Sequence, residues 1–259
     1  MSRAQQLFRK AARTAQVHIP LLRELGKSAE HRWRRLTRAT HDRELDGLRL
    51  IDVPGGALFL DVGANRGWAT HSIRTLCPEA RIEGFEPNPE MARRIARLYR
   101  SPDALHQLAL SDRAGEVPLY VPTYRGLAFD GLASLSEAEA RRWLSPETLF
   151  GFDPGCVGMR RIAVRAVPLD SFGVDPFFIK IDVQGHEHDV IAGGLATIAS
   201  SRPIIFAESQ VLDIARVLGL LSPWGYRVWR FNGTFRAGEV SEENVYLVPE
   251  SKAGLIQWT

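Results

Sequence analysis

Cysteine is scarce: the 259 residues include only Cys77 and Cys156. Two cysteines form at most one disulfide, so the chain is not a disulfide-stabilised secreted domain, and a reducing, cytoplasmic environment is expected. Neither cysteine has a Cys-x-x-Cys or Cys-x-x-His companion, which argues against a zinc site. No stretch approaches 18 uninterrupted apolar residues, so no membrane-spanning helix is expected.

Lysine is also scarce, since only four of the 33 basic residues are Lys. We attribute this arginine bias to codon usage and not to nucleic-acid recognition. Residues 1–50 hold 12 Lys/Arg and 5 Asp/Glu, a net charge of +7, and the remainder holds 21 and 25, a net charge of −4. The sequence therefore predicts a basic N-terminal extension, residues 1–50, on a mildly acidic body, residues 51–259.

The extension is expected to be helical, with an interruption near Ile19-Pro20. The first helix carries a stripe of apolar residues, Phe8, Ala11, Ala12, Ala15 and Ile19. The second carries four arginines around Trp33, namely Arg32, Arg34, Arg35 and Arg38. One interpretation is peripheral contact with an anionic membrane. We favour an arm that packs on the domain or on a partner subunit of a homodimer, because a charge run is usually a solvated face. No nucleic-acid-reading motif accompanies the basic residues, so no specific nucleic-acid partner is expected.

The most informative segment begins with the apolar run 57–60, which ends in Asp61 and a glycine loop, 63–67. A helical pattern over 68–76 and a second strand over 81–85 follow, and Glu86 closes the unit. Such units place an acid at the tip of the second strand, where it binds ribose hydroxyls. The segment therefore predicts a nucleoside site.

Asn65 separates this loop from the dinucleotide fingerprint. That fingerprint needs a bare glycine at the corresponding position so that the backbone can approach a pyrophosphate. An asparagine side chain would crowd a diphosphate. The loop therefore favours a nucleoside without phosphates, with S-adenosylmethionine as the leading candidate, over the nicotinamide dinucleotide of an oxidoreductase.

Strands and helices alternate from residue 57 onward. Strands are expected over 57–62, 81–86, 105–110, 117–121, 177–183, 203–208, 226–231 and 245–248, and helices over 68–76, 189–200 and 211–221. A further helix begins at Pro89, with Asn88 as its N-cap. Repeated β-α-β units with continuous apolar strands predict an α/β fold, a mainly parallel sheet covered by helices on both faces.

Five motifs stand in order along the chain: Asp61-Val62-Gly63-Ala64-Asn65-x-Gly67, Phe85-Glu86-Pro87-Asn88-Pro89, Ala109-Leu110-Ser111-Asp112, Val167-Pro168-Leu169-Asp170 and Ile179-Lys180-Ile181-Asp182-Val183-Gln184-Gly185-His186-Glu187. Over about residues 58–208 the set closely resembles the FkbM-type family of S-adenosylmethionine-dependent methyltransferases. The chain departs from the family at Gln184, where the family usually has Glu. The resemblance implies a Rossmann-like class I methyltransferase fold, a seven-stranded sheet with an antiparallel edge.

The motifs and the resemblance together assign cofactor contacts. Asp61 and the loop of Gly63, Asn65 and Gly67 are expected to cradle the methionine end, Glu86 to bind the ribose, and Ser111 and Asp112 to meet the adenine. Asp182 is expected to orient the acceptor and the cofactor ammonium. Ser111 and Asp112 could instead be an ordinary pair of turn residues without contact to the adenine.

The candidate catalytic residues are His186, Asp182 and Glu187, which follow the apolar run 177–179. His186 is the first choice of general base, because its ordinary pKa suits proton removal near neutrality, and Asp182 is the second. His186 would otherwise be a surface histidine at a helix start, and Glu187 would stabilise that helix through its dipole. Asp182 and Glu208 could share Mg²⁺, but Gln184 replaces a carboxylate, so no metal is expected.

Between residues 122 and 161 the alternation weakens. Glycines and prolines interrupt it, and Ser136 with Glu139 forms a capping box at the start of a helix. An irregular insert of this length is often functional. We interpret it as a substrate lid with Trp143, Phe150 and Phe152 as apolar contacts; the alternatives are a structural cap or a disordered loop.

The sequence thus predicts an O-methyltransferase that transfers a methyl group to a hydroxyl of a sugar, glycolipid or polyketide; the family resemblance alone supplies this acceptor class. The absence of an Asn/Asp-Pro-Pro-aromatic tetrapeptide favours oxygen over nitrogen acceptors by the same resemblance. Two alternatives remain open. One is an N- or protein methyltransferase, and the other is a non-catalytic or differently specific nucleoside-binding protein that works through its basic arm.

Overall fold

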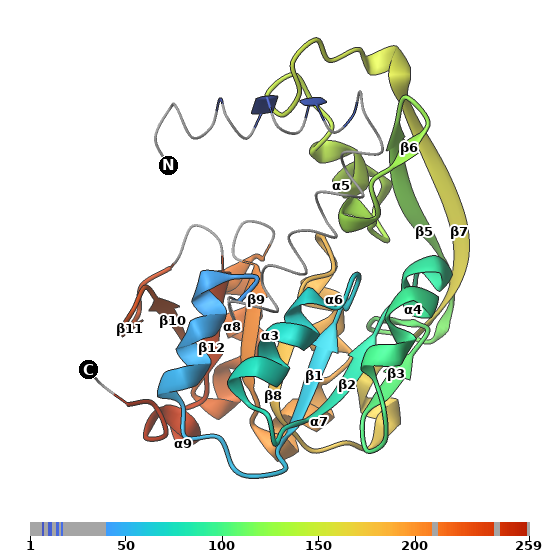
Figure 1. Cartoon of the computed structure of the whole chain (residues 1–259). Coiled ribbons are helices and arrows are strands. Elements are labelled where there is room, and N and C mark those ends of the chain that lie inside the picture. Colours follow the sequence, from blue (N-terminus) through green and yellow to red (C-terminus); the bar gives the residue numbers. More distant parts are fainter. Residues whose placement is uncertain are drawn as a thin grey trace. The chain divides into compact units, whose positions relative to one another are not determined.

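The computed structural model describes residues 7, 10, 11, 14, 15, 17, 40–208, 212–240 and 244–257 (Figure 1). The predicted break at Ile19-Pro20 and the arginine cluster around Trp33 lie outside the described residues. The chain divides into two compact units, which we describe separately. The smaller comprises Met1–Ala39 and Pro118–Ile162, and the larger comprises Thr40–Val117 and Ala163–Thr259.

An eight-stranded sheet forms the centre of the larger unit, in the order β11-β10-β12-β9-β8-β1-β2-β3. Its strands are β1 (Leu58–Val62), β2 (Arg81–Phe85), β3 (Ala104–His106), β8 (Pro176–Ile181), β9 (Ile204–Glu208), β10 (Arg227–Phe231), β11 (Phe235–Ala237) and β12 (Asn244–Val248). The run from β3 to β9 is parallel, whereas β12 lies antiparallel between β9 and β10. This order confirms the predicted parallel sheet with an antiparallel edge. The three-residue β11 is one strand more than predicted.

Alternate side chains of the strands point to opposite faces of the sheet and pack in two hydrophobic clusters. In β1, Phe59 joins the first cluster, while Leu58, Leu60 and Val62 join the second. The first cluster receives η1 (Arg43–Leu50), α3 (Trp68–Leu76) and the end of α4 (Pro89–Ile95). The second receives α6 (Glu187–Ala192), α7 (Leu195–Ser201) and α8 (Ile214–Leu221). The short helices η2 (Ala96–Leu98), η5 (Leu169–Phe172), η6 (Ser222–Trp224) and α9 (Glu250–Ala253) complete the unit.

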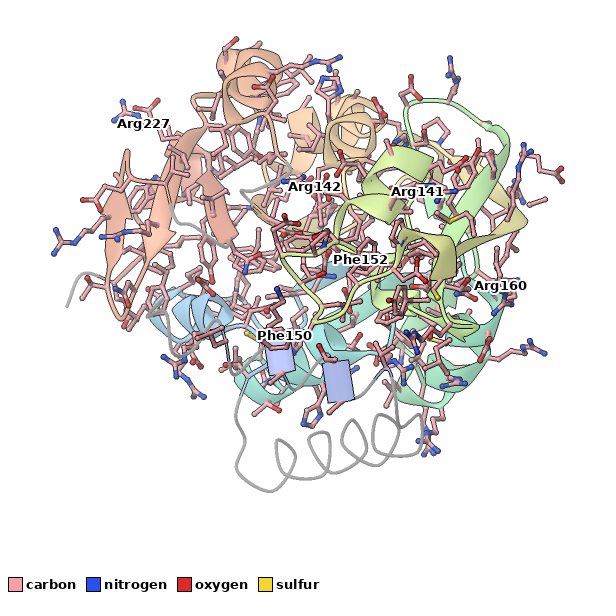
Figure 2. All side chains as sticks on the ribbon, turned by 90° about the horizontal axis from the view of Figure 1, so that it is seen from above. Arg141, Arg142, Phe150, Phe152, Arg160 and Arg227 are labelled. Carbon is pink, nitrogen blue, oxygen red and sulfur yellow. The ribbon has the colours of Figure 1, made fainter. Side chains whose placement is uncertain are left out.

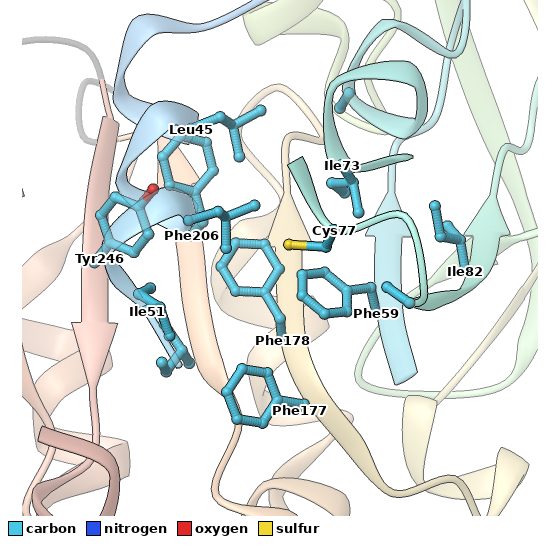
Figure 3. Close-up of a cluster of buried hydrophobic side chains, with 14 of the residues drawn as sticks. Leu45, Ile51, Phe59, Ile73, Cys77, Ile82, Phe177, Phe178, Phe206 and Tyr246 are labelled. Carbon is cyan, nitrogen blue, oxygen red and sulfur yellow. The ribbon is translucent and has the colours of Figure 1, made fainter. Parts of the chain in front are cut away.

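Aromatic rings dominate the first cluster (Figure 3). The ring centroid of Phe178 on β8 lies 5.0 Å from that of Phe59, and the Phe206 centroid lies 5.0 Å from that of Tyr246. Aromatic pairs at such separations add to the free energy gained by burial. They join the central parallel strands to the antiparallel edge through one continuous layer.

Residues 43–50 correct the predicted extent of the extension. Leu45 and Leu48 of η1 are buried in the first cluster, and the Tyr246 hydroxyl donates a hydrogen bond to the Glu44 carbonyl. These residues therefore belong to the larger unit. The change of charge at residue 50 did not mark this packing boundary, because a helix with a charged outer face can still bury an apolar one.

Two predicted elements are divided in the structure. The strand expected over 105–110 becomes β3 and β4 (Ala109–Leu110), which lie in different sheets. The helix expected over 189–200 is interrupted between α6 and α7 at Gly193-Gly194. At Gly193 a Cβ atom would lie 1.9 Å from the Ser111 carbonyl oxygen, so the close backbone approach requires glycine where α6 ends.

The insert is more regular than the sequence predicted. Strands β4, β5 (Gly115–Tyr124), β6 (Leu127–Ala128) and β7 (Val157–Val167) form a second sheet in the order β4-β7-β5-β6. Strand β7 was missed because its arginines, Arg160, Arg161 and Arg165, obscured the apolar alternation. Ser136 caps α5 (Glu137–Arg142) as predicted, accepting a hydrogen bond from the Glu139 amide. The short helices η3 (Asp130–Leu132) and η4 (Pro154–Cys156) lie on either side of α5 in the chain.

The smaller unit has its own core, in which Val17 is buried with Tyr124, Leu144 and Leu149. The Phe152 ring stacks on Tyr124, whereas Phe150 is exposed (Figure 2). Of the predicted apolar stripe, Ala11 and Ala15 are exposed. The N-terminal residues instead contact the insert through Lys10, Thr14 and Val17. For example, the Phe150 amide donates a hydrogen bond to Thr14 Oγ1. The lid function stays a prediction.

The close approach of the loops after β1 and β8 gives a test of the larger unit. Gly63 and Gly56 both have a positive φ, of 79° and 72°. A Cβ at Gly63 would lie 1.9 Å from the Asp182 carbonyl oxygen, whereas a Cβ at Gly56 meets nothing within 4 Å. Gly56→Ala should lower the free energy of unfolding by about 1 kcal/mol through its φ alone, and Gly63→Ala by about 2 kcal/mol more through the clash. Urea unfolding measures both, and equal losses would show that the loops separate freely.

Candidate active site

The loop after β1 is held by its own backbone. The amides of Gly63 and Ala64 both donate to the Phe85 carbonyl, at 2.9 and 3.0 Å, and the Gly67 amide donates to the Ala64 carbonyl at 2.7 Å. Gly67 then begins α3 with a φ of 75°, and a Cβ there would clash with Leu98. These glycines therefore fix the loop against β2, and their amides are already committed to backbone acceptors.

Glu86 lies at the carboxyl end of β2 and is 5% exposed. Its two carboxylate oxygens accept the amide hydrogens of Asn65 and Asn88, each at 2.7 Å. Burial raises the pKa of Glu86 to about 7, although the two amides and the Lys180 ammonium oppose the increase. The structure thus places the Asn65 backbone against Glu86, and the amides of Asn65 and Asn88 together hold the acid.

Lys180 occupies the centre of a buried ionic cluster. Its Nζ lies 3.3 Å from Asp61 Oδ1 and 3.6 Å from Asp182 Oδ2, and it donates to the Gly63 carbonyl at 3.0 Å. Burial alone would lower the pKa of Lys180, but the two carboxylates outweigh it and raise that pKa above its ordinary value. Lys180 is therefore a permanent cation that joins β1, its loop and β8.

Asp61 faces into this cluster and not toward solvent. It is wholly buried, and Thr70 Oγ1 donates to its Oδ2 at 2.6 Å. Thr70 in turn lies 2.6 Å from the Tyr99 hydroxyl. Asp61 thus acts on the site through Lys180 and the loop, a role that the sequence could not specify because Thr70 and Tyr99 carry no motif.

Gln184 connects the carboxyl ends of β8 and β9. Its Nε2 donates to Asp182 Oδ1 at 2.8 Å and to Glu208 Oε2 at 3.1 Å. Both hydrogens of the amide are used, so a neutral side chain bridges two carboxylates that would otherwise repel each other. Asp182 remains 46% exposed and is the most accessible of the three predicted catalytic side chains.

His186 lies at the start of α6 with both ring nitrogens engaged. Its Nδ1 lies 2.9 Å from Asp189 Oδ2, and its Nε2 lies 3.0 Å from Ser111 Oγ. Ser111 is buried and also contacts Asp112 Oδ1 at 3.2 Å. The structure therefore brings His186 to the predicted adenine pair. Asp189 was missed, although it is the first residue of the predicted helix and lies only three positions after His186.

Glu187 is buried at 1% exposure and closes the loop after β8. Its Oε1 accepts from the Val183 amide, and both of its oxygens accept from the Gly185 amide, at 3.0 to 3.2 Å. Burial raises the pKa of Glu187. Because the carboxylate accepts hydrogen bonds from amides of its own loop, the structure gives Glu187 the role of stabilising that loop.

The charges at this edge fit a cationic nucleoside. Asp61 and Asp182 lie beside the ammonium of Lys180, which also acts electrostatically on Glu86. The amides of Gly63, Ala64, Asn65 and Gly67 already have acceptors. Carboxylates favour a sulfonium and an ammonium and repel phosphates. Glu86, Asp182 and Asp112 offer acceptors for hydroxyl, ammonium and amino hydrogens. These residues fit S-adenosylmethionine, which carries all of these groups.

A family model described as the methyltransferase FkbM domain matches residues 61–228, which include every predicted site residue. The chain belongs to this family. The match confirms the resemblance carried by the five motifs, and this FkbM domain is a methyltransferase domain.

One curated relative of this FkbM chain is the 2-O-methyltransferase NoeI of Sinorhizobium fredii (strain NBRC 101917 / NGR234). It is 32% identical over 162 residues, which are 61% of this chain and 65% of the relative. The chain thus spans about two thirds of that relative's length.

Among solved structures, the methyltransferase FkbM of Methylobacillus flagellatus KT is 15% identical, with a TM-score of 0.46, over 74% of this chain and 43% of that one. The precorrin-6y C5,15-methyltransferase of Geobacter metallireducens GS-15 is 13% identical, with a TM-score of 0.40, over 81% and 91%.

The described residues contain neither a group of metal-binding side chains nor a membrane-spanning helix. In that part of the chain, no three or more His, Cys, Asp and Glu side chains are grouped to hold a metal ion. No helix within the same residues is long and apolar enough to cross a membrane.

The raised pKa of Glu86 predicts a pH dependence of stability. The carboxyl has an ordinary pKa of 4.5 and a folded value of about 7, so the folded protein binds its proton more tightly. This contribution is complete below pH 4.5 and disappears as the pH rises through 7, lowering the free energy of unfolding by about 3 kcal/mol. In Glu86→Gln this part of the decline should vanish.

Urea unfolding between pH 4.5 and 8 measures the difference between the wild type and Glu86→Gln. The exposed Glu116, changed to Gln, is the matched control and should follow the wild type. Parallel curves for the wild type and Glu86→Gln would contradict the assignment to Glu86.

Proposed function

We propose that the protein is an S-adenosylmethionine-dependent O-methyltransferase whose acceptor is a hydroxyl of a sugar, glycolipid or polyketide. The family match over residues 61–228 carries the proposal, because it covers the whole carboxylate-rich edge of the sheet. The name of the 2-O-methyltransferase relative supports a hydroxyl acceptor.

The cofactor, when bound, supplies a methyl group activated by its sulfonium charge. Glu86 would hold the ribose hydroxyls, since an ionised carboxylate accepts hydrogen bonds in addition to those from the two amides. Ser111 and Asp112 would meet the adenine, and Asp182 would attract the ammonium. Methyl transfer then depends largely on how well the chain aligns the acceptor hydroxyl.

We assign removal of the hydroxyl proton to Asp182. His186 has partners at both nitrogens and Glu187 is buried, whereas Asp182 is 46% exposed and keeps free lone pairs. Lys180 and Gln184 hold its two oxygens in place. An oriented carboxylate of this kind can accept the proton as the oxygen–methyl bond forms.

Calorimetric titration with S-adenosylmethionine, S-adenosylhomocysteine and NAD tests the cofactor. Both sulfur nucleosides should bind and NAD should not, and Glu86→Ala should weaken binding at least tenfold through the lost ribose hydrogen bonds. Since binding favours ionised Glu86, complex formation near pH 6.5 should release a proton, visible as a heat that varies with the buffer. NAD binding would restore the oxidoreductase alternative, and no binding of any of the three would favour the non-catalytic one.

The role of Asp182 is tested by transfer of a labelled methyl group to a panel of monosaccharides, oligosaccharides and glycolipids. On the best acceptor, Asp182→Asn should lower kcat by about 10²- to 10⁴-fold, the usual contribution of a general base. Glu208→Gln, which alters the other end of the Gln184 bridge, is the matched control and should retain kcat within about threefold if only the base matters. Equal losses in both variants would show that the carboxylates act only through their charge.

A further inference from the structure

Gln184 has a backbone conformation that residues with a side chain disfavour. Its φ is 56°, in the left-handed region, where a Cβ atom causes strain and glycine is relaxed. The other residues at positive φ in the loops of the candidate site are three glycines and an asparagine, which tolerate this region: Gly63, Gly67, Gly185 and Asn65. Strain that persists in a folded loop indicates that the side chain causing it has a use.

The side chain of Gln184 contacts two carboxylates that the sheet brings together. Strands β8 and β9 are parallel, and Ile181 pairs with Ala207 in their register. The next residues, Asp182 and Glu208, therefore lie side by side at the ends of neighbouring strands. Like charges on neighbouring strands cost stability. The Gln184 amide donates to both carboxylates, at 2.8 and 3.1 Å, and so satisfies them without adding a charge.

The chemistry of this bridge explains why the residue is neutral. An ionised carboxylate can only accept hydrogen bonds, so the amide nitrogen, which carries two hydrogens, must face both acids. A glutamate of the same length would donate nothing while ionised, and it would place three negative charges together. Because neighbouring like charges disfavour ionisation, such a cluster would hold a proton to a higher pH.

Asp182 depends on the bridge for the direction of its carboxylate. Its backbone amide donates to the Val62 carbonyl at 3.1 Å, so the main chain is fixed and rotation of the carboxylate is the freedom that remains. Lys180 Nζ lies 3.6 Å from Asp182 Oδ2, beyond the range of a directional hydrogen bond. The hydrogen bond from Gln184 to Oδ1, at 2.8 Å, therefore sets the angle of the carboxylate.

We propose that Gln184 is a positioning residue whose neutral amide aims the Asp182 carboxylate at the acceptor hydroxyl and separates it from Glu208, so that the base stays ionised. The inference rests on the proposed function, in which Asp182 removes the hydroxyl proton. It extends that function to the strained residue beside the base. Glycine would relax the backbone but has no amide to donate, and glutamate has the right length but the wrong charge.

Two substitutions separate the bridge from the backbone. Gln184→Gly relieves the strain and removes both hydrogen bonds, whereas Gln184→Glu keeps the length and replaces the donor by a charge. With the best acceptor of the panel above, Gln184→Gly should lower kcat about 10- to 100-fold, the value of one hydrogen bond to a charged group. Cofactor affinity should change less, because the charge of Asp182 that attracts the ammonium remains. Thermal unfolding shows whether each variant is folded.

The pH profile distinguishes positioning from a purely structural role. In Gln184→Glu the acidic limb of the kcat profile should move to higher pH by about one unit or more, because the added charge holds a proton in the cluster. Transfer of a labelled methyl group between pH 5 and 9 measures this limb. A limb at the wild-type position, with kcat lowered equally at every pH, would leave Gln184 a structural role and overturn the proposal.

Arg202→Gly is the matched control for the backbone. Arg202 also has a positive φ, of 49°, but it lies at the end of α7, where its side chain contacts Ala199 and Trp224. This variant should keep the wild-type kcat and pH profile. A loss in Arg202→Gly equal to that in Gln184→Gly would show that relaxing any strained loop lowers activity, and the proposal would fail.

Carbon NMR of the Asp182 carboxylate, assigned through Asp182→Asn, gives a measurement that needs no acceptor. Its titration should move to higher pH in both Gln184 variants and further in Gln184→Glu, since one variant loses a donor and the other also gains a charge. An unchanged titration would overturn the proposal even if kcat fell. If the wild type methylated no member of the panel while the titration moved, the proposed function would fail and the effect of the bridge on Asp182 would be confirmed.

Discussion

The buried ammonium of Lys180 is the interaction on which the rest of the site depends. It lies between β1 and β8 and contacts Asp61, Asp182 and the Gly63 carbonyl. Removing one partner of such a buried pair leaves a charge without compensation and usually costs about 3–5 kcal/mol. The ammonium can stay buried only while the glycine loop and the loop after β8 remain close, and Gly63, which has no Cβ to clash with Asp182, allows that approach. A positive centre inside the sheet thus fixes the carboxylates that surround it.

Neutral amide groups order the carboxylates that Lys180 alone does not hold in place. The Gln184 amide bridges Asp182 and Glu208, and the amides of Asn65 and Asn88 hold Glu86. Each bridge keeps a carboxylate ordered without neutralising it by a second cation. The result is an edge whose net charge is negative, which suits a cofactor that carries a sulfonium and an ammonium. The neutral Gln184 fits this pattern, because a third carboxylate between the other two would need a cation.

Much of the fold could be predicted because continuous apolar strands and capped helices are local signals. Helix 68–76 has the predicted bounds, strand 81–85 ends within one residue of its predicted end, and Asn88 and Ser136 cap their helices as expected. Errors occurred where tertiary contacts override the local pattern. The strand expected over 105–110 divides between two sheets, and the helix expected over 189–200 divides where Gly193 packs against Ser111. No pattern within one segment reports such long-range contacts.

The sequence by itself determined the family, the parallel sheet and the residues gathered at its carboxyl edge, because motif order and strand ends are properties of the chain. Only the tertiary structure decided what those residues do. Asp182 is accessible to solvent, whereas Glu187 is buried and accepts hydrogen bonds from its own loop. Contact across the fold commits His186 to Ser111, 75 positions away. Hydrogen bonds have direction and burial has a cost, and neither can be assigned until distant segments meet.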